Sequence, residues 1–313
     1  MIRANPGMKR VDVCVCTYRR PHLEQTLRSL ARLELPEGLE VRVVVADNDT
    51  RPSARGLVEA LASALPFDIR YVHCPASNIS LARNACLDAA DGDFLAFVDD
   101  DTTVSPQWLA ALLATAAATG ADAVLGPVRA VYSRSAPGWM RRGDFHSTEP
   151  VRVNGEIRTG YSGNVLLDLA SPYVGGRRFN LALGRSGGED TAYFSQLRRA
   201  GGRLAHAPDA VAHEPVTEER ARFSWLAKRR FRSGQTHGRL LAAERAPLPQ
   251  ACLASAKALF CFGAALAFAP VPHRRNRQVL RGLMHAGVVS GLLGLREIHL
   301  YGDEPAKGRT HAA

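Results

Sequence analysis

The most informative stretch of this sequence is Phe94-Leu95-Ala96-Phe97-Val98-Asp99-Asp100-Asp101-Thr102. Its first half is an apolar run rich in Phe and Val, which is typical of a buried strand. The run ends in three consecutive carboxylates, which repel one another and are costly to leave unpaired at the edge of a core. A divalent Mg2+ or Mn2+ ion removes that cost, because both ions prefer carboxylate oxygen and bridge to phosphate oxygens. The stretch therefore predicts a metal that holds a phosphorylated ligand.

The same acids also fit a solvated turn in front of a helix. Ser105 and Pro106 follow them, and Ser is a favoured N-cap while Pro suits the first helical position. A turn is satisfied by one Asx residue and does not require three after an apolar strand. The metal interpretation is therefore the leading one, and the turn remains an alternative.

Strand-like and helix-like segments alternate along the chain. β-branched or aromatic runs predict strands at residues 11–16, 41–46, 69–72, 94–98, 123–128 and 164–167. Helical spacing of apolar residues predicts helices at 22–33, 53–65, 80–90 and 191–200. This alternation is typical of βαβ units, so we expect an α/β fold with a mixed, mostly parallel central sheet flanked by helices.

Polar clusters follow three of the predicted strands. They are Thr17-Tyr18-Arg19-Arg20, Asp47-Asn48-Asp49 and Asp99-Asp100-Asp101. In open sheets of this kind ligands bind beyond the carboxyl ends of the strands, so we expect the three clusters along one edge. A dinucleotide-binding domain would carry a Gly-rich turn after the first strand, and residues 17–21 contain no glycine, which argues against nicotinamide chemistry.

Composition and charge narrow the choice of partners. The chain has 313 residues, a length that suits one large α/β domain with appendages or two smaller domains. Its formal net charge is +10. Much of the excess positive charge lies between Arg220 and Arg281, where nucleic acid, anionic phospholipid or a pyrophosphate substrate would each be attracted. The sequence shows no helix-turn-helix, zinc-finger or RNA-binding motif, so we expect no nucleic-acid partner.

The C-terminal region combines apolar and basic segments. Residues 251–269 are almost wholly apolar, and a second apolar stretch at 282–295 is too short to span a bilayer comfortably. Between them lies His273-Arg274-Arg275-Asn276-Arg277, which suits the anionic cytoplasmic leaflet. We expect a cytoplasmic protein held peripherally on the inner face of the cell membrane, with a spanning helix or a buried helical subdomain as alternatives. The polar start of the chain and the lack of CxxC pairs agree with the cytoplasm.

Six short motifs occur in a fixed order. They are Val13-Cys14-Val15-Cys16-Thr17-Tyr18-Arg19-Arg20, Asp47-Asn48, Ala82-Arg83-Asn84, Val98-Asp99-Asp100-Asp101, Ser162-Gly163-Asn164 and Gly188-Glu189-Asp190. With them the chain resembles the inverting family 2 glycosyltransferases of the GT-A fold, particularly exopolysaccharide enzymes of the succinoglycan glucosyltransferase type. The resemblance implies an N-terminal extension at 1–9, a GT-A catalytic domain at 10–215, a basic helical segment at 216–248 and an apolar and basic helical region at 249–313.

The resemblance implies a nucleotide-sugar site at the strand ends. Thr17, Tyr18 and Arg19 would contact the nucleotide, and Asp47 beside Asn48 would accept a hydrogen bond from a base edge such as the uracil imide. Asp47 also fits a turn cap. Arg83 would lie near the base or the pyrophosphate, although an arginine on an ordinary helix surface is the commoner case.

The resemblance also assigns a metal site and a base. Asp99 and Asp101 would form the DxD site for Mn2+ or Mg2+ across the donor diphosphate, with Asp100 between them and His213 as a weaker third ligand, or a structural histidine. Asp190 would deprotonate the acceptor hydroxyl, with Glu189 as orienter or acceptor contact. A helix-start acid pair, favoured by the helix dipole, is the competing interpretation of these two residues.

These assignments predict an enzyme that moves one sugar from a nucleotide-diphospho-sugar, UDP-linked, to a saccharide or lipid-linked saccharide acceptor with inversion. Such a reaction belongs to polysaccharide or glycoconjugate synthesis. The QxxRW motif of processive family members does not occur in the sequence, which favours a single transfer. Alternatives are a nucleotidyltransferase, which would need a Gly-rich phosphate loop with a lysine, and an inactive, membrane-associated nucleotide-sugar-binding protein.

Overall fold

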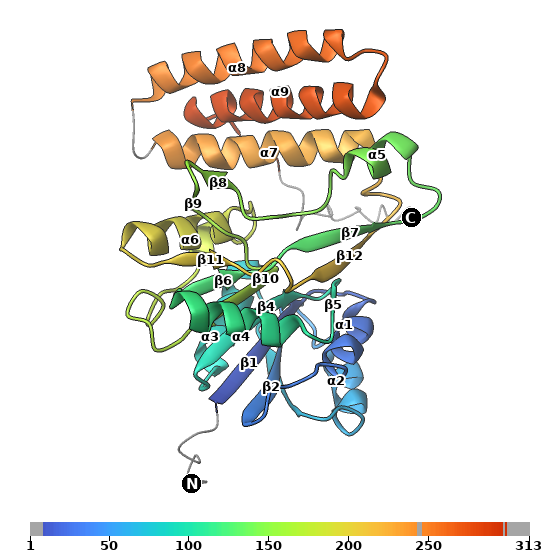
Figure 1. Cartoon of the computed structure of the whole chain (residues 1–313), viewed down its shortest axis with the longest axis vertical. Coiled ribbons are helices and arrows are strands. Elements are labelled where there is room, and N and C mark those ends of the chain that lie inside the picture. The colour runs from blue at the N-terminus through green and yellow to red at the C-terminus, as the bar shows by residue number, and fades with distance from the viewer. Residues whose placement is uncertain (1–8, 243–245, 297, 299–313) are drawn as a thin grey trace, which may run out of the picture. The chain divides into compact units, whose positions relative to one another are not determined.

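The computed structural model describes residues 9–242, 246–296 and 298 (Figure 1). These residues form two compact units. The first comprises residues 9–184 and 188–222, and the second comprises residues 185–187 and those from 223 onward. The first unit thus continues beyond the domain end expected at residue 215.

A seven-stranded sheet is the centre of the first unit, in the order β11-β6-β10-β4-β1-β2-β3. β10 runs antiparallel to both of its neighbours, β4 and β6, and all other neighbouring strands are parallel. The mixed, mostly parallel α/β sheet expected from the alternating segments is therefore confirmed. The strands are β1 Lys9–Thr17, β2 Leu39–Asp47, β3 Asp68–His73, β4 Phe94–Asp99, β6 Ala123–Leu125, β10 Asn164–Asp168 and β11 Leu204–His206.

Helices cover both faces of this sheet (Figure 1). Helices α1 (Leu23–Leu30), α2 (Arg55–Ala62) and α4 (Trp108–Thr119) bury their apolar residues in one core. Helices α3 (Ile79–Ala89) and α6 (Glu189–Arg199) pack in the other. The two-residue period of a strand explains the division, because successive side chains point to opposite faces. In β1, for example, Val13 and Val15 enter the first core and Cys14 the second.

The expected strand at 123–128 is wrong as a single element, because it is divided between two sheets. β6 ends at Leu125, and β7 (Val128–Tyr132) joins β12 (Ala212–Val216) and β5 (Thr103–Val104) in a three-stranded sheet. Gly126 and Pro127 make the break: a Cβ on Gly126 would lie 2.4 Å from the Ala210 carbonyl oxygen, and Pro127 has no N–H for a ladder.

Three shorter elements complete the first unit. They are the hairpin of β8 (Arg152–Val153) and β9 (Glu156–Ile157), helix α5 (Gly138–Gly143) and a 3-10 turn at Leu181–Leu183. Ser105 is not the N-cap of the helix that follows the acids, because α4 begins at Trp108 with Gln107 at its N-cap. The Trp108 N–H instead donates to the Ser105 carbonyl oxygen at 3.0 Å, so Ser105 and Pro106 form a turn before the helix.

The second unit is built from three helices, α7 (Phe223–Ala242), α8 (Pro247–Ala267) and α9 (Pro272–Leu292). α9 packs against both α7 and α8, whereas α7 and α8 touch little. The predicted C-terminal helical region is present, with α8 beginning two residues before the boundary expected at 249. The short apolar stretch expected at 282–295 lies in the second half of α9 and the residues after it.

Candidate active site

The three polar strand ends meet at one edge of the large sheet. Cys16 of β1 pairs with Asp99 of β4, and the next residue, Thr17, pairs with Asp47 of β2. The carboxyl ends of three neighbouring parallel strands therefore lie side by side, as the apolar strand interiors predicted. Thr17 is buried at this edge.

The acid cluster at the end of β4 is partly open to solvent. The Asp99 side chain is 51% exposed, which leaves part of its carboxylate open to a ligand. The protein around the rest of the group removes water and raises the pKa of Asp99 to about 6, with Arg83 opposing and Asp101 adding to the rise. Burial likewise raises the pKa of Asp100 to about 7. The surroundings of Asp99 and Asp100 therefore disfavour the ionised form of both carboxyl groups.

The cluster fits a hard divalent cation. Its donors are carboxylate oxygens, and a bound cation would relieve the repulsion that raises the two pKa values. Among residues 9–242, 246–296 and 298, no three His, Cys, Asp or Glu side chains already stand together as a metal site. Mg2+ is commonly held by one or two carboxylates together with water and substrate phosphates. His213 is exposed on β12, paired with Thr103 just after the acids, so it is near the cluster but not joined to it.

Arginines from two distant segments hold the cluster in place. Arg20 Nε lies 3.7 Å from Asp100 Oδ1, and Arg20 Nη2 lies 3.7 Å from Asp101 Oδ2. Arg220 Nη2 lies 3.3 Å from Asp101 Oδ2, and Arg220 Nη1 pairs with Glu214 on β12. The sequence did not single out Glu214 or assign Arg220 to the site. No local pattern joins either residue to an acid cluster more than a hundred residues earlier.

The predicted base lies at the start of α6. This helix begins at Glu189, two residues before the start expected from the sequence, and Gly188 forms its N-cap with a φ of +92°. The Asp190 carboxylate accepts a hydrogen bond from the Thr191 N–H at 2.6 Å. Loss of hydration, followed by the charge of Glu189, raises the pKa of Asp190 to about 6. A carboxyl whose pKa lies near neutral is well matched to general-base work.

A buried arginine connects the base to the acid cluster. Arg83 of α3 forms an ion pair with Glu189, and its Nη2 lies 3.9 Å from Asp99 Oδ1. Arg83 and Glu189 are both buried, so the alternative of an arginine on an ordinary helix surface is wrong. Removing one partner of such a pair costs about 3–5 kcal/mol, because the other charge stays buried. The second Glu189 oxygen, Oε2, is buried without a hydrogen-bond partner in the described part of the chain.

Asp47 stabilises the turn that follows β2. Its carboxylate is fully buried and accepts hydrogen bonds from the Ala54 N–H at 2.8 Å, the Asp49 N–H at 3.1 Å and the Tyr71 hydroxyl at 2.7 Å. Asn48 Oδ1 accepts from the Asn78 N–H at 3.1 Å and so ties β2 to the start of α3. This is the turn-capping alternative. A contact between Asp47 and a base edge would have to replace one of these bonds and stays a prediction.

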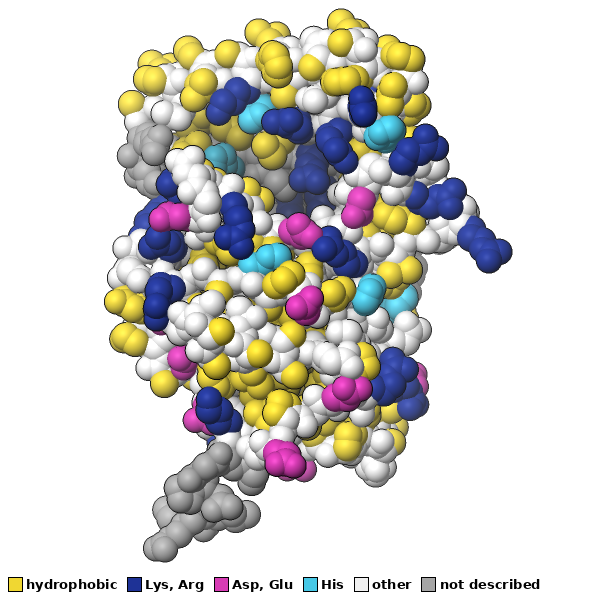
Figure 2. All heavy atoms as spheres, viewed as in Figure 1, with side chains coloured by type: hydrophobic (Ala, Val, Ile, Leu, Met, Phe, Trp, Pro, Cys, Tyr) yellow, Lys and Arg dark blue, Asp and Glu magenta, His cyan; other side chains and the backbone are white. Residues whose placement is uncertain are grey.

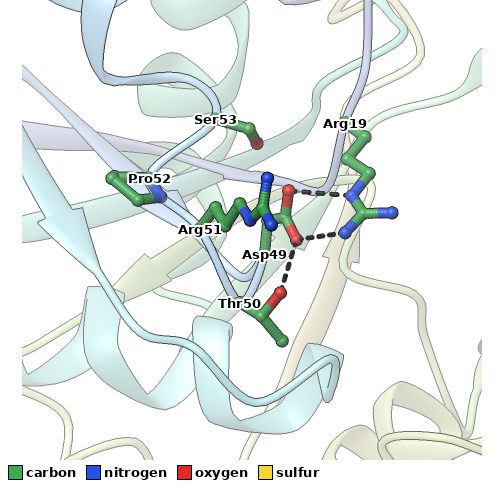
Figure 3. A pocket seen from close by; sticks show the side chains of 6 residues that line it. All are labelled: Arg19, Asp49, Thr50, Arg51, Pro52 and Ser53. Atoms are coloured by element: carbon green, nitrogen blue, oxygen red, sulfur yellow. Dashed lines mark hydrogen bonds and ion pairs between the residues drawn. The ribbon is translucent and has the colours of Figure 1, made fainter.

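An open cavity of about 590 Å³ lies beside the ends of β1 and β2 (Figure 3). Arg19 reaches across it, and its Nε and Nη2 each donate to Asp49 at 2.8 Å. The pair holds the pKa of Asp49 well below its usual range. Arg19 has a φ of +52°, and its guanidinium lies 5.2 Å from the Tyr18 ring. The cavity thus presents a planar cation and hydrogen-bonding groups, which suit a nucleoside. Its remaining lining residues are Thr50, Arg51, Pro52 and Ser53.

The Ser162-Gly163-Asn164 motif supports the cluster from β10. Asn164 is fully buried: its Oδ1 accepts from Trp108 Nε1 at 2.8 Å, and its Nδ2 donates to the carbonyls of Pro127 and Ala210. A Cβ on Gly163 would lie 2.4 Å from Asp99 Oδ2. Only glycine therefore lets β10 run this close to the acid cluster.

Gly163→Ala is expected to displace the Asp99 carboxylate and to lower kcat/KM by about a hundredfold, the scale of a misplacement near 1 Å. The melting temperature should change little, because the half-exposed Asp99 side chain has room to move. Steady-state kinetics and thermal unfolding measure the two effects. Gly56→Ala is the matched control, because a Cβ at Gly56 meets nothing within 4 Å. Equal kinetics for the two variants would show that activity does not depend on the exact position of the Asp99 carboxylate.

Comparison with known proteins agrees with this geometry. The family model "Glycosyl transferase family 2" matches residues 12–182. The chain is 61% identical over 295 residues to the succinoglycan biosynthesis protein ExoM of Rhizobium meliloti (strain 1021), covering 93% of this chain and 96% of that protein. A mannosyltransferase from Pyrobaculum calidifontis, solved with GDP-Man and Mn2+, aligns with a TM-score of 0.61 at 21% identity, over 92% of this chain and 88% of that one. S. aureus TarS 1-349 with UDP-GlcNAc aligns with a TM-score of 0.53 at 17% identity, over 91% and 92%.

The sheet topology and the structural likenesses show the GT-A fold. The matched family model and the 61% identical relative show that the chain belongs to glycosyl transferase family 2. The fold and the family expected from the six motifs are therefore both confirmed.

Proposed function

We propose that this enzyme moves one sugar from a UDP-linked donor to a saccharide or lipid-linked saccharide acceptor, with inversion at the anomeric carbon, in polysaccharide synthesis. One observation carries the proposal: Arg83 joins the half-exposed Asp99 of the acid cluster to the Glu189-Asp190 pair. Arg83 thus connects the acids that we assign to the leaving group with the pair that contains the assigned base. The similarity to ExoM supports a role in exopolysaccharide synthesis, and the TarS complex supports a UDP-linked donor.

The side chains divide the work as follows. Asp190 takes the proton from the acceptor hydroxyl, and Glu189, held by Arg83, orients that hydroxyl through its unpaired oxygen. Asp99 and Asp101 would hold a Mn2+ or Mg2+ ion, which when bound neutralises charge on the departing diphosphate. Arg220 and Arg20 keep Asp101 and Asp100 in position. Arg19 and Tyr18 bind the nucleoside at the open cavity.

The same proposal places the enzyme at the inner face of the cell membrane, where a lipid-linked acceptor would be found. The basic residues at the start of α9, among them Arg274, Arg275 and Arg277, support this location, since each basic group near an anionic surface contributes about 1 kcal/mol. Within the described residues, α8 is the helix long and apolar enough to cross a membrane by length and composition.

Stereochemistry tests the reaction. With Asp190 as base and no covalent intermediate, an α-linked UDP-sugar should give a β-linked product, because a single displacement inverts the anomeric carbon. A panel of nucleotide sugars is incubated with and without a lipid-linked saccharide, and the product linkage is read by proton NMR. An α-linked product would require two displacements and would contradict the assignment. Release of UDP equal with and without acceptor would show hydrolysis instead of transfer.

A further inference from the structure

We propose that the second unit inserts into lipid through the outward face of α8, with the helix lying in the plane of the membrane. The inference deepens the proposed membrane attachment and rests on it. It specifies which surface enters the bilayer and in which orientation, neither of which follows from the glycosyl-transfer chemistry.

The side chains of α8 are distributed in the opposite way to those of a water-soluble helix. Every buried residue on it is small, and these residues are Ala251, Ala254, Ala258, Cys261 and Ala265. Large apolar side chains point outward instead: Leu259, Phe260 and Leu266 are 72%, 75% and 79% exposed. Figure 2 shows hydrophobic side chains along the exposed side of this helix, at the top of the view. Exposed apolar surface gathered in this way marks an interaction site.

Charge identifies lipid as the occupant. Between residues 223 and 296 the sequence holds a single acidic residue, Glu244, against many lysines and arginines. An apolar face in a strongly basic unit matches an anionic bilayer, which offers acyl chains and negative headgroups together. The basic residues of the described helices are Lys228, Arg229, Arg230, Arg232, Arg239, Lys257, Arg274, Arg275, Arg277 and Arg281.

The contact between α7 and α9 suits a lipid environment. Gly234 and Gly238 of α7 face Gly287 and Gly291 of α9, and a Cβ on any of the four would come within 2.0 to 2.3 Å of a backbone oxygen of the other helix. Gln235 Nε2 donates to Ser290 Oγ at 2.9 Å within this contact. Close backbone approach at small residues and interhelical hydrogen bonds hold helices together where lipid removes the hydrophobic effect. The contact between α7 and α9 can therefore persist when α8 inserts into the membrane.

The position of Lys257 decides the orientation. This residue is exposed near the middle of α8, and a charge at the centre of a bilayer is costly. In the plane of the membrane its long stem can lie along apolar surface while the ammonium group reaches the headgroups. A helix of this length also satisfies the dimensions of a span, but only with Lys257 near the midplane. The in-plane arrangement avoids that cost.

The test measures binding of the full-length protein to vesicles. The variant Leu259→Gln, Phe260→Gln, Leu266→Gln is compared with Val151→Gln, Val153→Gln, which removes exposed apolar side chains from the first unit. The α8 variant should bind anionic vesicles at least about tenfold more weakly, because fully burying one such side chain contributes about 1.5–3 kcal/mol. The control variant should bind like the wild type. Turnover with a water-soluble saccharide acceptor should be the same in all three proteins.

Cys252 offers a direct probe of insertion. It is the exposed cysteine of the six and lies seven and fourteen residues before Leu259 and Leu266, so it shares their stripe. An environment-sensitive fluorophore on Cys252 should shift to the blue with anionic vesicles and be quenched by lipids brominated near the headgroup end of the chains. Quenching strongest at the bilayer centre would overturn the in-plane orientation.

The remaining outcomes distinguish insertion through α8 from membrane attachment in general and from glycosyl transfer. If the α8 variant binds vesicles as tightly as the wild type, the attachment stands and α8 is not the inserted face. If the wild type ignores vesicles and forms a concentration-dependent dimer that the α8 variant abolishes, a second copy covers this face, and the inference and the attachment both fail. In either case UDP release that depends on acceptor would leave the glycosyl-transfer proposal intact.

Discussion

Asp190→Asn is expected to lower turnover by roughly two to four orders of magnitude, the usual range for loss of a general base. The amide keeps the size of the side chain and can still accept the hydrogen bond from the Thr191 N–H, but it cannot take a proton. The affinity for the donor should barely change, because the assigned donor contacts lie on other segments. Single-turnover kinetics and donor titration by calorimetry measure the two quantities. Near-normal turnover would transfer the role to Glu189 or to another residue.

The pH profile gives this prediction a second test. Because the pKa of Asp190 is raised to about 6, the base is protonated and inactive below that pH, so turnover with saturating donor should fall as the pH drops through about 6. Saturating donor keeps donor binding from limiting the rate. The Asp190→Asn variant should lose this fall in turnover at low pH.

Asp101→Ala is expected to abolish donor binding and turnover together. The substitution removes one of the two carboxylates assigned to the metal, and without the metal the donor diphosphate is repelled by the carboxylates of Asp99 and Asp100. It also removes the partner of Arg220, which keeps its ion pair with Glu214. Donor titration in the presence of Mn2+, and Mn2+ binding followed by electron paramagnetic resonance, measure the loss without relying on activity.

Asp168→Ala is the matched control for this prediction. Asp168 belongs to β10 and pairs with Phe94 at the opposite end of β4, so its carboxylate lies away from the cluster. The control should bind Mn2+ and donor normally. Full activity of the wild type in excess chelator would contradict the metal assignment, and so would normal donor affinity in Asp101→Ala.

The sequence was sufficient where local pattern and chemistry coincide. The alternation of strands and helices predicted the sheet, and the rule that ligands bind beyond parallel strand ends predicted that Thr17, Asp47 and Asp99 would meet at one edge. Errors fell at element boundaries. Residues 123–128 proved to be parts of two strands, and α6 begins at Glu189 because Gly188 takes a left-handed conformation. Both depend on backbone conformations and close approaches that hydrophobic periodicity does not report.

The site divides in the same way. The amino-acid sequence by itself determined the family, the acid triplet at the end of a buried strand and the acid pair after a glycine loop, because each is a short motif of neighbouring residues. Only the tertiary structure decided which charged residues, distant in the sequence, form ion pairs with one another. It joined Arg83 to Glu189, 106 residues away, and Arg220 to Asp101. It also buried Asp47 under three hydrogen bonds and turned the large side chains of α8 outward. These contacts depend on the order of the strands in the sheet and on the sheet face that each helix covers. Neither property can be read from the order of residues within one segment.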